Sequence, residues 1–139
     1  MNNNRTTNLL NKDHIKFLFS IFEKNNAEIR LVGGCIRDLF LNKEIKDIDT
    51  ATVIEPNEIL EILNSNNIEY DDFAIQYGSI IAYPLDQKVQ ITTLREDVNQ
   101  IGRHTNVIYT TNWEKDAARR DFTFNAMYIG NKNKLYDYY

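Results

Sequence analysis

The chain has 139 residues, of which 42% are hydrophobic and 26% are charged, and its formal net charge is −4. This length is enough for one globular domain with a core, and too short for two ordinary domains. The acidic balance excludes a protein that coats nucleic acid through general cationic attraction. A single cysteine excludes an intramolecular disulfide framework and a zinc site made of several cysteines.

The sequence shows neither a membrane segment nor a signal peptide. No apolar run approaches the roughly 20 residues that a membrane helix requires, and the first residues lack a basic stretch followed by an apolar one. We therefore expect a cytoplasmic protein with no membrane contact. Residues 1–11 are polar and rich in asparagine, which predicts a disordered N-terminus, and one folded domain is expected over residues 12–139.

Helical and strand-like hydrophobic patterns follow one another along the chain. In chain order they predict a helix over residues 11–25, a strand over 28–32, a short helix over 35–40, a strand over 45–53, a helix beginning at Pro56, strands over 68–73, 79–83 and 88–94, a helix over 112–119, and closing strands over 127–130 and 135–138. Residues 95–111 show no clear period, which is typical of a functional or mobile loop. Helices and a run of strands segregate, so we predict an α+β fold with a mixed or antiparallel sheet.

An acidic pair, Asp47 and Asp49, falls in the second predicted strand. Residues two apart in a strand point to the same face about 6–7 Å apart, so both carboxylates would aim at one point. Mg²⁺ is typically held by one or two carboxylates together with substrate phosphates. The pair therefore predicts a magnesium site, with a solvated acidic strand end as the alternative.

Two glycines, Gly33 and Gly34, separate the first predicted strand from the short helix. Residues without side chains let backbone N–H groups approach an anion, and the helix N-terminus adds favourable partial charge. Arg37 follows within one turn and carries a guanidinium suited to a phosphate oxygen. A triphosphate cradle is one interpretation, and a tight turn is the other.

Cys35 lies in the same segment, and because neither His14 nor His104 is an obvious partner, we predict a buried packing residue rather than a nucleophile.

A third segment places the adjacent charges Arg119, Arg120 and Asp121 just before the run FTFNAMYI. Taken in order, LVGGCIRD, DID, ITTLRED and RRDFTFNAM resemble the head domain of the class II tRNA nucleotidyltransferase (CCA-adding enzyme) and bacterial poly(A) polymerase family, over residues 28–137. The resemblance implies a polymerase-beta-like nucleotidyltransferase fold, with a small mixed sheet flanked by helices. It also implies template-independent transfer of nucleotides to an RNA 3′ end, either as tRNA CCA addition or as poly(A) addition.

The resemblance further implies roles for individual residues. They are metal binding and catalysis by Asp47 and Asp49, triphosphate binding by Gly33, Gly34 and Arg37, nucleotide contact by Arg119 and Arg120, an acidic catalytic role for Asp121, and a position near the nucleotide sugar for Asn125. The implied ligands are ATP, CTP and the 3′ end of tRNA or another RNA. Two Mg²⁺ ions would activate the RNA 3′-hydroxyl and stabilise the departing pyrophosphate.

The sequence departs from the family pattern in two ways. Gln90 stands where the family commonly has an acidic residue, and a neutral amide cannot supply the charge of a third carboxylate, although Asp121, or less readily Glu96 or Asp97, could compensate. Family members also continue into helical domains that read the base and hold RNA. We therefore expect a fragment, or one half of a split enzyme with a separate helical partner chain. The alternative is an inactive nucleotide-binding remnant; a minimal antitoxin-type or antibiotic-modifying enzyme is disfavoured, because those usually carry Gly-Ser ahead of the acidic pair.

Overall fold

The computed structural model describes residues 3–45, 47–96, 107–120, 126–131 and 134–138, with side chains described from residue 7 onward. Within these residues, a seven-stranded sheet has the order β3-β4-β5-β2-β1-β8-β9. Its strands are β1 (Ile29–Val32), β2 (Asp49–Thr52), β3 (Tyr70–Asp71), β4 (Ser79–Ala82), β5 (Val89–Thr93), β8 (Met127–Ile129) and β9 (Leu135–Asp137). Strands β2 and β5 are parallel, and the other neighbouring pairs are antiparallel. The predicted α+β fold with a mixed sheet flanked by helices is confirmed.

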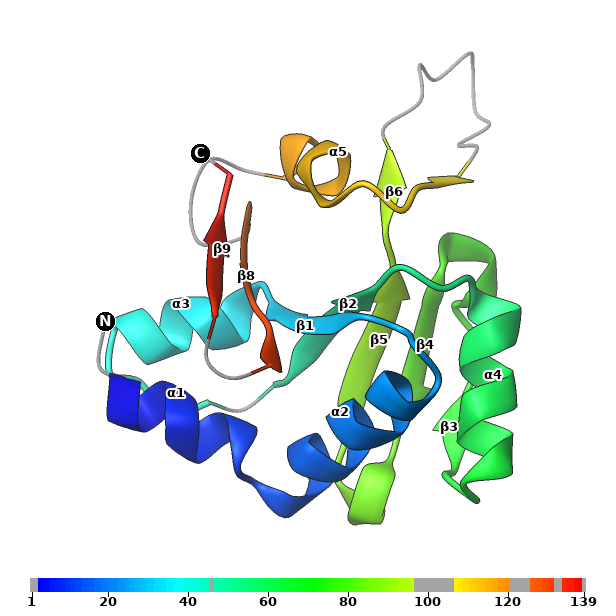
Figure 1. Cartoon of the computed structure of the whole chain (residues 1–139), viewed down its shortest axis with the longest axis horizontal. Helices are drawn as coiled ribbons and strands as arrows, with labels where there is room; N and C mark the ends of the chain where they lie inside the picture. The colour runs from blue at the N-terminus through cyan, green and yellow to red at the C-terminus, as the bar shows by residue number, and fades with distance from the viewer. Residues whose placement is uncertain (1–2, 46, 97–106, 121–125, 132–133, 139) are drawn as a thin grey trace.

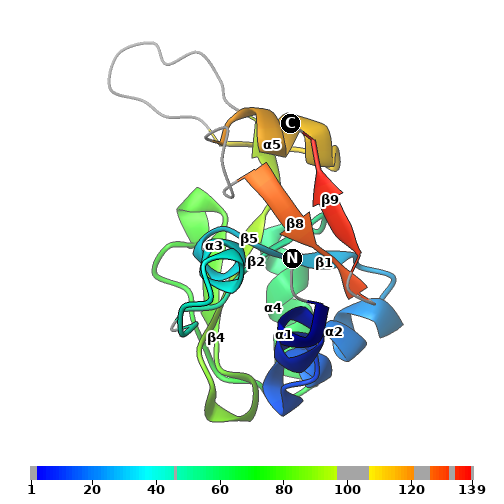
Figure 2. The ribbon, with the colours of Figure 1, turned by 90° about the vertical axis from the view of Figure 1, so that its left-hand side faces the viewer.

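Helices cover both faces of this sheet. They are α1 (Asn3–Leu10), α2 (Asp13–Lys24), α3 (Gly34–Phe40), α4 (Pro56–Ser65) and α5 (Trp113–Ala118), with the short 3-10 turns η1 (Ile75–Tyr77) and η2 (Pro84–Asp86). Figures 1 and 2 both show α5 at the opposite end of the molecule from α1 and α2. No helix in the described residues is both long enough and apolar enough to cross a membrane.

The larger core lies between one face of the sheet and helices α1 to α4. Helix α2 buries residues at three- to four-residue spacing, as the sequence predicts: Ile15, Leu18, Phe19, Ile21 and Phe22. Strand β5 alternates, with Val89 and Ile91 buried in this core and Gln90 and Thr92 half-buried. Because successive strand residues point to opposite faces, Gln90 and Thr92 belong to the other face.

A smaller cluster lies on that second face, beneath α5. It includes Val32, Leu94, Trp113 and Tyr128, with the Trp113 and Tyr128 rings edge to face at 5.0 Å. The buried Arg30 guanidinium carbon lies 3.8 Å from the centroid of the Trp113 ring, so the ring is an anchor of this cluster. Helix α5 therefore packs on this second face through Trp113 and Ala117.

The first helix differs from the expected disordered start over residues 1–11. Asn3–Leu10 form α1, and Leu9 is only 2% exposed in the main core. The asparagine-rich composition predicts fraying, whereas burial of an apolar residue against a neighbouring helix stabilises a segment of weak intrinsic helicity. The domain boundaries expected at residues 12 and 139 stay predictions.

The segment over residues 95–111, expected to be a loop, contains a two-stranded ribbon at its base. Strands β6 (Arg95–Glu96) and β7 (Ile108–Tyr109) pair antiparallel, with Arg95 opposite Tyr109. Its two-residue strands are too short to show an alternating hydrophobic pattern, which explains why the sequence does not reveal them. The loop prediction for residues 97–106, including Asp97 and His104, falls outside the described residues.

Candidate functional site

The glycine turn joins β1 to α3, as the sequence predicts. Gly33 has φ +78° and ψ −138°, a conformation that residues with a side chain rarely adopt, and its carbonyl accepts the first bonds of α3. A β-carbon on Gly33 would lie 3.4 Å from Asp49 Oδ2. The turn therefore brings bare backbone next to the Asp49 carboxylate.

Arg37 lies beside the same turn. A β-carbon on Gly34 would lie 3.4 Å from Arg37 Nη2, so the guanidinium passes over the start of α3. The Arg37 side chain is 54% exposed, and its Nε lies 3.4 Å from Asp38 Oδ1. An exposed guanidinium in weak contact with one carboxylate can still bind an anion from solvent.

The two predicted metal-binding aspartates line one pocket. It has a volume of about 300 Å³ and is lined by Asp47, Ile48, Asp49, Lys88 and Gln90. The prediction that both aspartates belong to a strand is wrong in one respect, because β2 begins at Asp49 and Asp47 precedes it. Strand β1 ends at Val32, opposite Asp49, and turns away into α3, so Asp47 has no partner on β1.

The electrostatics of this pocket favour a cation. Burial raises the pKa of the Asp49 carboxyl, the negative charge of Asp47 raises it further, and the positive charges of Arg120 and Lys88 offset part of the increase. A raised pKa means that the ionised carboxylate lacks enough compensating charge. The carboxylates of Asp47 and Asp49 supply oxygen ligands, which suit a hard divalent ion such as Mg²⁺.

Gln90 takes the position next to Asp49 on the neighbouring strand. The two residues are register partners in the parallel β2–β5 pair, and Gln90 Nε2 donates to Ser79 Oγ at 3.4 Å. Among the described residues, no third acidic, histidine or cysteine side chain joins Asp47 and Asp49 in a metal-binding group. Glu96 pairs instead with Lys115 Nζ at 3.3 Å, so it does not compensate. Asp121 and Asn125, also predicted for this site, lie outside the described residues.

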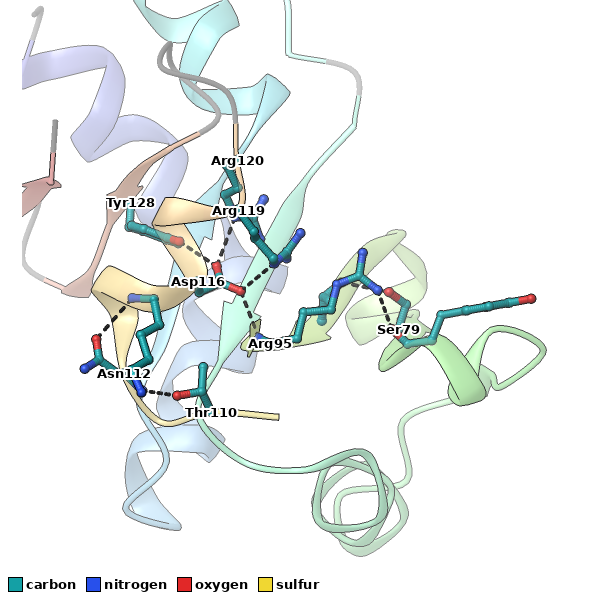
Figure 3. Close-up of polar contacts among 11 residues, drawn as sticks. Ser79, Arg95, Thr110, Asn112, Asp116, Arg119, Arg120 and Tyr128 are labelled. Carbon is teal, nitrogen blue, oxygen red and sulfur yellow. Dashed lines mark hydrogen bonds and ion pairs between the residues drawn. The ribbon is translucent and has the colours of Figure 1, made fainter. Parts of the chain in front are cut away.

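The paired arginines, Arg119 and Arg120, immediately follow α5 and converge on one aspartate (Figure 3). Asp116 is completely buried. Its Oδ1 accepts from Arg119 Nε at 3.1 Å, and its Oδ2 accepts from Arg120 Nε at 3.0 Å. Asp116 is not among the residues predicted for the site, although its spacing of three and four positions from the arginines is a helical signal visible in the sequence.

Asp116 keeps its charge despite burial. Burial alone would raise the pKa of its carboxyl, but Arg120 and Arg119 together with two hydrogen bonds more than offset burial, so the pKa lies below the ordinary value of 3.8. The same Arg120 charge also acts on Asp49. The α5 terminus therefore belongs electrostatically to the pocket at the starts of β2 and β5.

Comparison with known protein sequences identifies the family. The family model of the poly A polymerase head domain matches residues 29–139. The chain belongs to this family. The mitochondrial CCA tRNA nucleotidyltransferase 1 of Danio rerio is 39% identical to this head domain over 128 residues, which are 91% of this chain and 30% of that protein. The human CCA tRNA nucleotidyltransferase 1 is 40% identical over 126 residues, covering 90% of this chain and 29% of the human protein.

Solved structures agree with the family assignment of this head domain. The CCA-adding enzyme of Bacillus stearothermophilus, solved in complex with CTP, superposes with a TM-score of 0.78 at 25% identity. The match covers 91% of this chain and 29% of that chain. The head domain therefore spans about 30% of the length of its curated relatives.

Cys35 is a packing residue in this head domain, as the sequence predicts. Its thiol is fully buried, and Sγ donates to the Val32 carbonyl at 3.3 Å. Burial raises the pKa of Cys35 to about 11. A thiol in this state is a poor nucleophile, because the reactive thiolate is scarce.

Proposed function

We propose that this head domain is the catalytic part of a template-independent nucleotidyltransferase that adds nucleotides to the 3′ end of tRNA. The observation that carries the proposal is the placement of Asp47 and Asp49 in one pocket, with Gly33 backbone against the Asp49 carboxylate. CCA addition is favoured over poly(A) addition because relatives at 39% and 40% identity are named CCA tRNA nucleotidyltransferases.

Each described group has a role in the proposed reaction, in which an RNA 3′-oxygen attacks the α-phosphorus of ATP or CTP and pyrophosphate leaves. Asp47 and Asp49 would hold Mg²⁺, which, when bound, lowers the pKa of the attacking hydroxyl and neutralises charge on the phosphates. Arg37 would donate to phosphate oxygens from the glycine turn, and Arg119 and Arg120 would do so from the end of α5. Guanidinium groups suit this role because they form strong, directional hydrogen bonds to phosphate.

Selection of the base and grip on the RNA are proposed to reside outside these 139 residues. A net charge of −4 gives little general attraction for RNA. The curated relatives are about three times as long as the region matched. We propose that a helical region, present as a separate partner chain or as further sequence, supplies both functions.

Incorporation of labelled nucleotide tests this function. The chain is mixed with labelled ATP or CTP, Mg²⁺ and tRNA lacking its 3′ end, with and without the helical region of a CCA-adding relative. We expect incorporation with the helical region, and its loss after Asp47→Ala plus Asp49→Ala. The matched control is Asp71→Ala plus Asp72→Ala, which removes the same charge from exposed positions in and beside β3, at the far edge of the sheet. Incorporation that survives the first pair would exclude the proposed site.

A second candidate is a nucleotide-binding remnant without catalysis. The neutral Gln90 in register with Asp49 is the observation that favours it, because it removes a possible third carboxylate from the site. Isothermal titration with ATP and Mg²⁺ separates the two functions. Binding without turnover, in the presence of the helical region, would favour the remnant, and Gln90→Glu should then increase metal affinity.

A further inference from the structure

Asp116 has no acceptor capacity left for a ligand. It is completely buried, and each of its oxygens already accepts two hydrogen bonds. The donors are the Arg95 backbone N–H and Arg119 Nε on Oδ1, and Arg120 Nε and the Tyr128 hydroxyl on Oδ2. A carboxylate offers about four lone-pair positions, so any function of Asp116 must act through these partners.

The arginine partners retain donors that Asp116 does not use. Both hydrogen bonds to Asp116 come from Nε, which leaves the terminal Nη groups of Arg119 and Arg120 to other acceptors. The two side chains are 12% and 16% exposed, so neither is free to sample many rotamers in water. Figure 3 shows both side chains converging on the buried carboxylate from the end of α5.

The carboxylate also fixes these arginines relative to the sheet. The Arg95 N–H lies at the start of β6, directly after the β5 end, and donates to Asp116 at 3.0 Å. Tyr128 lies in β8 and donates from the other side of the cluster. Asp116 therefore joins α5 to two strands, and the guanidinium that it holds on Oδ2 belongs to Arg120, whose charge reaches Asp49.

We propose that Asp116 is a positioning residue that holds Arg119 and Arg120 in the arrangement that receives the phosphates of the incoming nucleotide. This inference rests on the proposed function, in which these arginines contact the triphosphate. Two neighbouring guanidinium groups repel each other, and a shared buried carboxylate offsets part of that repulsion before the ligand arrives. Preorganisation of this kind increases affinity because less ordering remains to be done on binding.

Titration of Mg²⁺·ATP and of Mg²⁺·tripolyphosphate into the 139-residue chain tests the proposal. Asp116→Asn should raise both Kd values by about tenfold. The charged carboxylate that accepts from both arginines is replaced by a neutral amide, whose nitrogen donates rather than accepts. The matched control is Tyr128→Phe, which removes a hydrogen bond from the same buried cluster but leaves both arginines their carboxylate. We expect Tyr128→Phe to lower the melting temperature and to keep both Kd values within about twofold.

A variant cycle separates positioning from general stability. In a background of Arg119→Gln plus Arg120→Gln, Asp116→Asn should leave Kd unchanged, because the residue then has no arginine to position. Asp116→Glu keeps the charge and displaces it by one methylene. Relative to Asp116→Asn, it should restore stability more fully than nucleotide affinity. It also provides the test if Asp116→Asn fails to fold. Recovery of affinity in step with stability would overturn the proposal, as would equal losses of affinity in Tyr128→Phe and Asp116→Asn.

The outcomes distinguish this inference from the proposed function. If the unaltered chain binds neither Mg²⁺·ATP nor Mg²⁺·tripolyphosphate, the proposed function fails and the positioning role fails with it. If the unaltered chain binds both probes and Asp116→Asn binds them equally well, only the positioning role is refuted.

Discussion

Adjacent substitutions at Gly33 and Gly34 are expected to have opposite effects on stability. Gly33 has φ +78° and ψ −138°, and a β-carbon there would lie 3.4 Å from Asp49 Oδ2. Gly33→Ala should therefore lower the free energy of unfolding by about 1–3 kcal/mol, the usual cost of placing a side chain in this region of backbone space. Gly34 is the first residue of α3, where alanine is a better helix former, so Gly34→Ala should raise it by about 0.5 kcal/mol.

The two substitutions also differ in their expected effect on the site. Gly33→Ala places a methyl group against the Asp49 carboxylate, so Mg²⁺·ATP should bind more weakly by about tenfold, since small displacements in a preorganised site are costly. Gly34→Ala contacts only the flexible end of Arg37, at 3.4 Å, and leaves the Asp49 carboxylate untouched, so it should weaken Mg²⁺·ATP binding less than Gly33→Ala does.

Urea unfolding measures stability, and isothermal titration measures Mg²⁺·ATP affinity, on the same preparations. Gly34→Ala is the matched control, because both variants add one methyl group at neighbouring positions. Equal stability of the two variants would refute the backbone argument for Gly33. Unchanged nucleotide affinity in a folded Gly33→Ala chain would refute the placement of the turn in the nucleotide site.

Three further predictions concern ionisation in the fold. The pKa of Asp49 is raised by burial and by Asp47, so stability falls as the pH rises from 3.8 through the folded-state value, and the full cost of the charge is present above that value. Asp49→Asn should therefore raise the metal-free free energy of unfolding at pH 7 and have little effect near pH 3. The pKa of Asp116 is lowered, because its arginine and hydrogen-bond partners outweigh burial. Its stabilising contribution is therefore present above pH 3.8 and is lost as the pH falls through the folded-state pKa. Asp116→Asn should flatten the acid limb of a plot of unfolding free energy against pH. Cys35, with its pKa raised to about 11, should react with a thiol reagent at pH 8 at least about 100-fold more slowly in the folded chain than in urea.

Each of these predictions has a clear contradicting result. A metal-free Asp49→Asn chain less stable than the unaltered chain at pH 7 would show that Asp49 is adequately compensated. Parallel acid limbs for the unaltered chain and Asp116→Asn would mean that Asp116 titrates as it does when unfolded. Similar thiol reactivity in folded and unfolded chains would place Cys35 at the surface.

Local patterns predict much of the fold from the sequence. The spacing of apolar residues locates α2, and the alternation at Val89, Gln90 and Ile91 assigns both faces of β5. The glycine pair marks the turn between β1 and α3 because its local backbone requirement is strong. These features depend on neighbours within a few positions, which is the information that a single sequence contains.

Features that depend on distant partners are not predictable in this way. Asp47 falls outside β2 because β1, its potential partner, ends at Val32. Helix α1 forms where Leu9 enters a core built mainly by later segments. Asp116 becomes important through the Arg95 N–H and the Tyr128 hydroxyl, which belong to other strands. The spacing of Asp47 and Asp49 predicts a metal site, and the family resemblance implies the same role, whereas the contacts of Asp116 with Arg95 and Tyr128 form only in the tertiary structure.

The parallel pairing of β2 with β5 has a consequence for how the domain folds. Asp49 and Gln90 are register partners in this pair, and α4, β3 and β4 lie between them along the chain. Parallel strands need such a crossover, and contacts between distant segments form slowly because closing a long loop costs entropy first. The pocket at Asp49 should therefore assemble late during refolding, after α2 and the β4–β5 hairpin. During refolding, nucleotide binding would then appear later than the helical circular dichroism signal. Nucleotide binding would therefore measure the last step of folding, and not the earlier formation of the compact helical state.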